Sequence, residues 1–226
     1  MSDYIHKEFP KTVGRKDFWN QIKRTVNGKR VSEEDISNIV KQITNHIHPN
    51  KKDHLLDLGC ANGALASYFF PIINEYTGVD FSKYLLGVAK EFFNPKNVQY
   101  VVEDAVVFIN SCDNSKIYTK ILIYGTMAYF SREGLINTIT KIKKDFINCE
   151  KVFIGNIPNR LKAKEFYNKG GVMEFNLDDN KSSIGIWWNP EELIKICKEI
   201  GFKTEILYMP DSFYGSKYRF DILLTR

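Results

Sequence analysis

"HLLDLGCANGALA", residues 54–66, begins as an apolar strand-like run and then breaks at Asp57, Gly59 and Gly63. A strand that ends in a glycine-rich turn before a helix lets a ligand approach the backbone closely, because glycine has no Cβ. Dinucleotide-binding enzymes use the spacing G-x-G-x-x-G there to hold a pyrophosphate. An acid at the strand end would instead repel a phosphate and accept hydrogen bonds from a cationic amine. The stretch therefore predicts a ligand with a positive amine and no phosphate.

Outward from this stretch, short β-rich runs alternate with longer amphipathic runs, which is typical of βαβ units and a parallel sheet. Seven strands are predicted, at residues 54–58, 76–79, 98–102, 120–124, 151–156, 203–208 and 218–225. Helices are predicted at residues 64–70, 82–93, 131–148 and from Pro190 to just before Gly201, with Ser82 as an N-cap. A long irregular insertion is expected over residues 158–186. The turn-rich stretch before the last strand suits a closing hairpin.

The length of 226 residues suits one substantial core. Residues 1–53 precede the first strand and contain two predicted helices, near residues 17–25 and 32–47. The second begins with "SEED", a serine N-cap followed by acids. We interpret residues 1–53 as an N-terminal helical lid and residues 54–226 as the single main domain.

Charge and cysteine usage exclude several classes of protein. The net charge is +5, and residues 1–53 hold 11 Lys and Arg against 7 Asp and Glu, a milder surplus than nucleic-acid-binding surfaces usually show. The four cysteines form no C-x-x-C pair, so we expect neither a metal site nor disulfides. No apolar run approaches the roughly 20 residues of a membrane span, and no signal-peptide core is present. The sequence therefore predicts a cytoplasmic protein without a membrane partner.

Three stretches together resemble a known family. The glycine stretch is similar to motif I of the class I S-adenosyl-L-methionine (SAM)-dependent methyltransferases, an acid followed by x-G-x-G-x-G, with Ala61 in place of the middle glycine. "YTGVDFSKYLLGVAK", residues 76–90, resembles the family's second-strand motif, and "VQYVVEDAVVF", residues 98–108, its third-strand motif. Acids at the ends of three successive strands are a stronger signal than the glycines alone. The resemblance covers residues 54–226.

The resemblance implies an α/β fold with a seven-stranded Rossmann-like sheet in the order 3-2-1-4-5-7-6, strand 7 antiparallel and helices on both faces. It implies SAM as cofactor and S-adenosyl-L-homocysteine (SAH) as product. Asp80 would accept hydrogen bonds from both ribose hydroxyls, Asp104 would accept from the adenine amino group, and the Ala105 backbone would donate to the ring. The full set of expected cofactor contacts is Trp19, Arg24, Asp57, Gly59, Cys60, Ala61, Gly63, Asp80, Phe81, Ser82, Glu103, Asp104, Ala105, Tyr124 and Gly125.

The N-terminal stretch "FWNQIKRTVNGK", residues 18–29, places an aromatic pair and two cations before a turn. Similar stretches close over the cofactor in small bacterial methyltransferases. On that resemblance Arg24 would bind the methionine carboxylate and Trp19 would pack against the ligand. The alternative is an ordinary surface helix that packs through Phe18, Trp19 and Ile22.

The acceptor of this fold lies over the ends of strands 4 and 5, here "YGTMAYF" (residues 124–130) and "GNIPNR" (residues 155–160). The catalytic candidates are Tyr129, which would orient or deprotonate a hydroxyl, and Asn156. All four histidines precede Asp57, away from these strand ends, although His6 could reach the site on a folded-over N-terminus. Candidate acceptor contacts are Tyr129, Arg160, Trp187 and Tyr214, with Lys162 and Lys164 beside Arg160 either binding an anionic acceptor or forming a solvated face.

These observations predict methyl transfer to a small molecule, at an oxygen of a polar, sugar-like or anionic metabolite. An RNA or protein methyltransferase is the first alternative, although the modest charge argues against nucleic acid. A protein that binds SAM without catalysis is the second. The oligomeric state stays open between monomer and homodimer.

Overall fold

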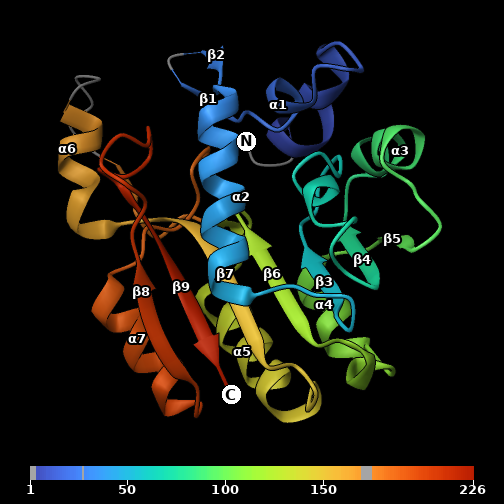
Figure 1. The fold of residues 1–226 in the computed structure, drawn as a ribbon. Coiled ribbons are helices and arrows are strands. Elements are labelled where there is room, and N and C mark those ends of the chain that lie inside the picture. Colours follow the sequence, from blue (N-terminus) through green and yellow to red (C-terminus); the bar gives the residue numbers. More distant parts are fainter. Residues whose placement is uncertain (1–3, 27, 169–174) are drawn as a thin grey trace.

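The computed structural model describes residues 4–26, 28–168 and 175–226. Its centre is a seven-stranded sheet in the order β5-β4-β3-β6-β7-β9-β8 (Figure 1). The strands are β3 (His54–Leu58), β4 (Glu75–Asp80), β5 (Val98–Val102), β6 (Lys120–Tyr124), β7 (Lys151–Pro158), β8 (Lys203–Leu207) and β9 (Arg219–Thr225). β9 pairs antiparallel with both β7 and β8, whereas the pairs among β3 to β7 are all parallel. The predicted order, with an antiparallel last strand, is confirmed.

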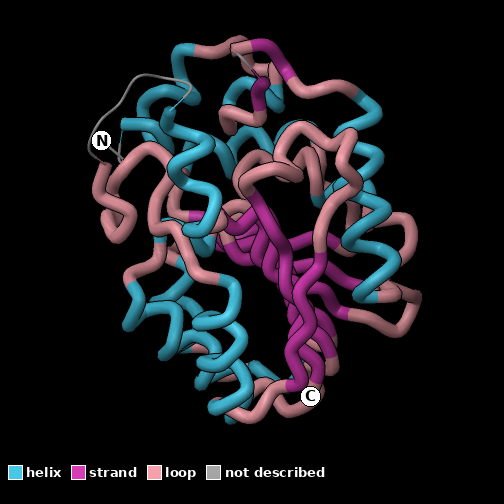
Figure 2. Tube along the Cα trace, turned by 90° about the vertical axis from the view of Figure 1, so that its left-hand side faces the viewer, coloured by secondary structure: helices cyan, strands magenta, loops and turns pink. Residues whose placement is uncertain are grey.

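Helices cover both faces of the sheet (Figures 1 and 2). On one face lie α4 (Ala105–Ser111), α5 (Arg132–Asp145) and α7 (Pro190–Glu199). On the other lie α2 (Glu33–Ile47) and α3 (Lys83–Phe92), and α1 (Phe18–Gln21) joins the same core from above the sheet. Successive strand residues point to opposite faces, so Leu56 joins the first core and its neighbour Leu55 the second. This two-sided burial explains why the parallel strands have near-continuous apolar sequences.

Helix boundaries follow local capping chemistry. The Ser82 hydroxyl accepts from the Leu85 amide at 3.4 Å, as the N-cap prediction requires. Ser32 and Asp35 form a reciprocal capping box at the start of α2. Pro190 is the first residue of α7, and Gly201 just beyond its end has a φ of +100°. These starts and stops were readable from sequence because each depends on residues within one turn.

Several predicted elements differ in the structure. The helix predicted at residues 64–70 is only the 3-10 turn Ala66–Tyr68, because Pro71 follows and disfavours helical backbone before it. α4 was not predicted, because seven residues are too few to show helical periodicity. Within the insertion expected to be irregular lies α6 (Ala163–Asn168), and residues 169–174 of that insertion are outside the described residues.

The N-terminal helix predicted at residues 17–25 is also shorter than expected. α1 ends at Gln21, and Lys23 takes a left-handed φ of +51° that turns the chain into the hairpin β1 (Thr25–Val26) and β2 (Lys29–Arg30). Two further short helical turns precede α1, namely Tyr4–Glu8 and Phe9–Thr12. This part of the chain lies above the carboxyl ends of the parallel strands (Figure 1).

A buried asparagine ties this segment to the glycine loop. The Asn62 side-chain amide donates to the Phe18 carbonyl at 2.7 Å and to Gln21 Oε1 at 2.9 Å. The N-terminal segment therefore sits directly on the loop where the ligand is expected. Within the described ranges, no helix combines the length and apolar character that a membrane crossing needs.

Candidate functional site

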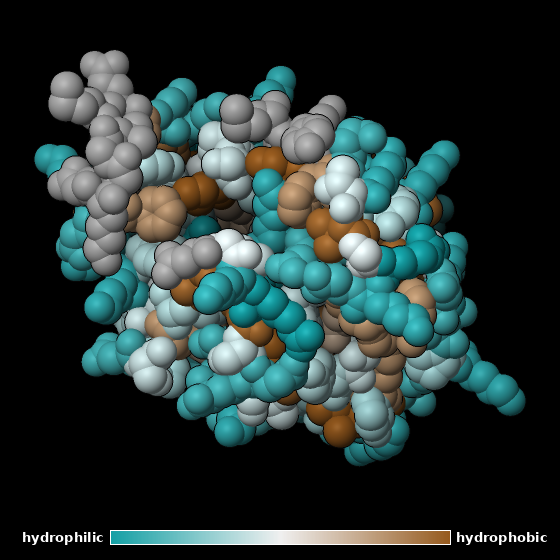
Figure 3. Space-filling view, turned by 90° about the horizontal axis from the view of Figure 1, so that it is seen from above, coloured by the Kyte–Doolittle hydropathy of each residue, from teal (hydrophilic) through white to brown (hydrophobic). Residues whose placement is uncertain are grey.

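A cavity of about 480 Å³ lies between the carboxyl ends of the parallel strands and the N-terminal segment. Figure 3 looks onto this end of the molecule and shows apolar side chains among hydrophilic ones around a hollow. The predicted site residues that line the cavity are Arg24, Asp57, Gly59, Cys60, Ala61, Asp80, Phe81, Asp104, Ala105, Tyr124, Gly125, Tyr129, Asn156 and Tyr214. Segments far apart in the sequence thus meet at one edge of the sheet.

The glycine loop is held tightly against its neighbours. Gly59 has a φ of +79°, and its amide donates to the Val79 carbonyl at 2.7 Å. A Cβ at Gly59 would overlap the Thr126 side chain, with Thr126 Cβ only 2.7 Å away. Ala61, where the family motif has glycine, adopts a φ of +51°, a conformation that costs a residue with a Cβ about 1–2 kcal/mol. The loop therefore keeps the glycine-like backbone despite the alanine.

Two buried acids face the cavity from this side. Asp57 accepts from the Tyr76 hydroxyl at 2.9 Å, and burial raises the pKa of Asp57 to about 7. Asp80 accepts from the Ala61 amide at 2.9 Å and the Ser82 amide at 2.8 Å. Burial raises the pKa of Asp80 to about 6, while the two amide hydrogen bonds oppose that rise. Asp80 thus holds the loop in shape and remains mostly ionised at neutral pH.

The third acid, Asp104, has a structural role that the sequence argument did not assign. Its Oδ1 accepts from the amides of Val106 and Val107, at 2.9 and 3.1 Å, and caps the start of α4. Within the part of the chain that the structure describes, its Oδ2 makes no hydrogen bond. The same carboxylate can therefore cap the helix and accept from a ligand amino group.

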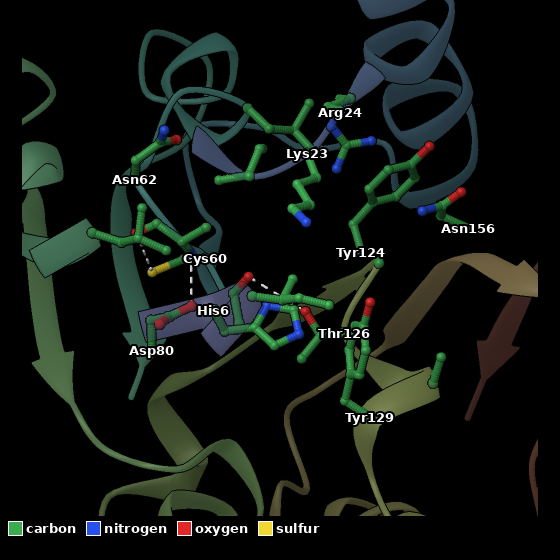
Figure 4. Close-up of a pocket in the computed structure, with 18 of the residues that line it drawn as sticks. His6, Lys23, Arg24, Cys60, Asn62, Asp80, Tyr124, Thr126, Tyr129 and Asn156 are labelled. Atoms are coloured by element: carbon green, nitrogen blue, oxygen red, sulfur yellow. Dashed lines mark hydrogen bonds between the residues drawn. The ribbon is translucent and has the colours of Figure 1, made fainter. Parts of the chain in front are cut away.

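On the opposite side of the cavity the charge is positive. Arg24 faces the Tyr124 ring, with 4.9 Å between the guanidinium carbon and the ring centre. Its Nε and Nη1 are buried, and no hydrogen-bond partner for them exists among the described residues. Buried guanidinium nitrogens without acceptors are costly, and a carboxylate would satisfy Nε and Nη1 in the bidentate geometry that arginine favours. Figure 4 shows Asp80 and Arg24 on opposite sides of the cavity.

These residues fit the chemistry of SAM. The acids Asp57, Asp80 and Asp104 suit an amine, hydroxyls and an amino-substituted ring, and the orphaned nitrogens of Arg24 suit a carboxylate. That cofactor would therefore be held by the three acids at the carboxyl ends of β3, β4 and β5 and by Arg24 of the N-terminal segment.

Other expected cofactor contacts lie outside the cavity lining. Trp19 is 5% exposed and packs into the core under the N-terminal segment, rather than facing a ligand. Gly63 has a φ of +76°, and a Cβ there would lie 2.8 Å from the Tyr100 hydroxyl, so its glycine serves packing. The Ser82 side chain is used as a helix cap. Glu103 is bound through its backbone amide to the Asp80 carbonyl, and its side chain is absent from the lining.

Two expected acceptor contacts also lie elsewhere. Arg160 forms a bidentate pair with Asp178, at 2.8 and 3.0 Å, so its charge is already matched. Lys162 pairs with one carboxylate oxygen of Glu165 at 3.0 Å. Trp187 is fully buried behind Phe166, with 5.4 Å between the ring centres. The anionic-acceptor role expected of the cluster around Arg160 therefore has no geometric support.

The two catalytic candidates do reach the cavity. Tyr129 donates its hydroxyl hydrogen to the Ser183 carbonyl at 3.0 Å, and burial raises the pKa of Tyr129. Both features favour the protonated phenol, which suits orienting an acceptor better than deprotonating it. Asn156 sits at a β-bulge in β7 with a φ of +62°, and its side chain faces the cavity (Figure 4).

The structure adds residues to which the sequence assigned no role, among them Lys23 and Arg219, and it also places Thr126 and Tyr218 in the cavity lining. His6 also lines the cavity, and its ring meets that of Tyr129 edge to face at 4.4 Å between centres. The N-terminus does fold over the strand ends and brings His6 to the cavity. For Arg219, the available signal was "YRF", residues 218–220, a cation between aromatics at the start of a strand.

Comparisons with known proteins agree with this architecture. Residues 56–114 match a family model described as a methyltransferase domain. No curated protein sequence matches the chain significantly.

Among solved structures, magnesium protoporphyrin IX methyltransferase from Synechocystis PCC 6803, with bound SAH, is 15% identical, with a TM-score of 0.64 over 100% of this chain and 97% of that one. A putative methyltransferase in complex with the Haloferax volcanii Trm112 activator is 12% identical, with a TM-score of 0.65 and coverages of 85% and 90%. The small RNA methyltransferase HEN1 is 13% identical, with a TM-score of 0.63, and the match covers 87% of this chain and 26% of that one. At such identities the likeness establishes the fold, and these proteins do not share one acceptor.

Proposed function

We propose that this chain, which belongs to the class I SAM-dependent methyltransferases, methylates an oxygen of a small polar or anionic molecule and releases SAH. The observation that carries the proposal is the charge-divided cavity, with acids on the strand ends β3 to β5 and, opposite them, Arg24, two of whose buried nitrogens lack a partner among the described residues. A volume of about 480 Å³ under a covering segment suits one cofactor and a small acceptor. This enclosure favours a small molecule over an RNA or protein acceptor.

In this proposal the protein contributes mainly position and exclusion of water. When bound, SAM supplies an electrophilic methyl group on a sulfonium sulfur. The acceptor hydroxyl would lie at the ends of β6 and β7, oriented by Tyr129 and Asn156. Tyr129 and Asn156 would hold the acceptor oxygen in line with the methyl group that bound SAM would supply, and the hydroxyl proton would pass to water. Alignment of this kind lowers the barrier.

The proposal is tested first at Arg24. Arg24→Gln removes the charge that would bind the cofactor carboxylate, so SAH affinity should fall about 10- to 100-fold, the usual worth of a charge-assisted hydrogen bond. The thermal midpoint should stay equal or rise, because buried guanidinium nitrogens without acceptors are lost. Calorimetry and thermal unfolding measure the two quantities.

The matched control is Arg15→Gln, on the same segment, where the arginine pairs with Glu91 at the surface. Its SAH affinity should be unchanged. Unaltered affinity in Arg24→Gln would exclude the assigned role, and a wild-type protein that binds neither SAM nor SAH would refute the proposed function itself. A mass-spectrometric screen for acceptors that gain one methyl group then identifies the substrate, whereas tight, salt-sensitive RNA binding would favour the first alternative.

We also propose that the part of residues 1–53 that precedes α2 acts as a lid, whereas α2 itself packs into the core on one face of the sheet and is not part of it. The hydrogen bonds from Asn62 to Phe18 and Gln21 join this segment to the glycine loop. A ligand that restrains the loop should therefore restrain the N-terminal segment as well. Hydrogen exchange should show amides of residues 17–26 gaining protection when SAH is added. Equal protection with and without SAH would mean that the segment is fixed scaffold.

The four cysteines are free thiols and three of them are buried, which suits the reducing cytoplasm that we propose as the site of action.

A further inference from the structure

Arg219, at the first position of β9, lies on the side of the cavity away from the glycine loop. In the sheet order, β9 is separated from β3 by β6 and β7. Three strand spacings correspond to roughly 14 Å between the backbone of β3 and that of β9. A cofactor held at the ends of β3 to β5 therefore leaves Arg219 to the space over β6, β7 and β9, where the acceptor would lie.

Among the residues that the structure describes, no acid matches the charge of Arg219. Its Nη1 donates to the Asn156 carbonyl at 3.1 Å, and no acid of the described residues forms an ion pair with it. By contrast, Arg132 at the start of α5 and Arg160 in the insertion share Asp178. Asp221, two residues further along β9, accepts a hydrogen bond from the Asn156 backbone amide at 2.7 Å and forms no ion pair with Arg219 among the described residues. A cation that faces a cavity without a carboxylate partner is available to an anionic ligand.

A strained bulge fixes where this cation points. Asn156 adopts a φ of +62° where the β7–β9 register shifts between Ile154 and Ile157. Asp221 accepts from the Asn156 amide, and Arg219 donates to the Asn156 carbonyl, so β9 holds both sides of the bulge. Backbone strain of this kind persists only where the surroundings maintain it. The bulge and Arg219 thus form one preorganised unit, which reduces the entropy cost of binding a ligand.

An aromatic wall stands beside this unit. Arg219 lies over the Tyr218 ring at 5.5 Å, and Phe166 packs against Tyr218 with 4.8 Å between ring centres. Phe166, Tyr214 and Tyr218 all line the cavity. Flat aromatic side chains next to a guanidinium match a planar ring that carries an acidic group, since the ring stacks while the acid binds the arginine.

We infer that Arg219 is a specificity-determining residue that binds the carboxylate of a ring-bearing acceptor. This inference rests on the proposed function and names the substrate class of the same cavity. It replaces the cluster around Arg160, whose charge Asp178 neutralises, as the site that recognises an anionic acceptor.

The test uses pairs of ring-bearing acids and their amides, headed by salicylate with salicylamide and protocatechuate with its amide. Binding to the full-length protein saturated with SAH is measured by ligand-observed NMR titration. The acids should bind at least about tenfold more tightly than their amides, as expected for a charge-assisted hydrogen bond. Arg219→Gln should remove this preference and leave SAH affinity unchanged, while Arg219→Lys should retain part of it.

Arg160→Gln is the matched control, because that arginine lies outside the cavity lining, and it should keep the full preference for acids. Acids and amides that bind alike, a panel in which no acid binds, or an undiminished preference in Arg219→Gln would each overturn the inference. In all these cases normal SAH affinity leaves the proposed function standing. If the wild-type protein does not bind SAH, that result contradicts the proposed function and, with it, this inference.

Discussion

Gly59→Val is expected to abolish SAH binding and to lower the thermal midpoint by about 10 °C. The φ of +79° is strained for a β-branched residue, and the new side chain would overlap Thr126. Strain and overpacking together cost about 3 kcal/mol, and each kcal/mol shifts the midpoint of a domain of this size by about 2–4 °C. Calorimetry with SAH and thermal unfolding give both values.

Gly14→Val is the matched control, because a Cβ at Gly14 meets no atom within 4 Å. It should change neither the midpoint nor the affinity. Adding Thr126→Ala to Gly59→Val should restore only part of the stability, since the overlap is relieved but the positive φ remains. Normal SAH binding by Gly59→Val would show that the glycine loop does not form the cofactor site.

The second large effect is expected at Asp80. Asp80→Ala should weaken SAH binding about 10- to 100-fold, because the carboxylate that would accept from the ribose hydroxyls is lost. Its hydrogen bonds to the Ala61 and Ser82 amides are lost as well, so Asp80→Asn, which keeps one acceptor oxygen, separates loop damage from ligand contact. The exposed Asp113→Ala is the control and should bind SAH normally.

The pH dependence gives an independent test of Asp80, whose pKa burial raises to about 6. If ligand hydroxyls donate to the ionised carboxylate, wild-type SAH affinity should fall about tenfold for each pH unit below 6. Asp80→Ala should lose that step, and a profile identical to the wild type would contradict the assignment.

Stability should move in the opposite direction to affinity. The native pKa values of Asp57 and Asp80, about 7 and 6, exceed the ordinary aspartate value of 3.8, so the folded protein binds more protons than the unfolded chain in that window. The contribution of these acids to the free energy of unfolding therefore falls as pH rises from about 4 to 7.

Much of the sheet was predictable because its signals are local. Each strand run is bounded by turn residues, Ser82 caps α3 through the amide of Leu85, and Gly201 follows the end of α7. The acids Asp57, Asp80 and Asp104 follow successive strands, and parallel strands bring their carboxyl ends to one edge of the sheet, so their meeting could be inferred as well. The order of the strands came from the family resemblance and not from any single segment.

Only the tertiary structure decided which remaining polar groups face the cavity. Arg160 follows the end of β7 and Arg219 begins β9, and nothing local to either distinguishes them as ligand contacts; yet Asp178 neutralises the first, and no described acid pairs with the second. Trp19 and Arg24 lie on one short segment, but the indole is in the core and the guanidinium in the cavity. The sequence by itself determined the strands and the acids of the cofactor side, because these depend on neighbours within a few residues. The ion pairs and the β7–β9 bulge depend on residues that are distant in the sequence, 18 positions for Arg160 and Asp178 and 65 for Asn156 and Asp221, and no local pattern records which of them meet.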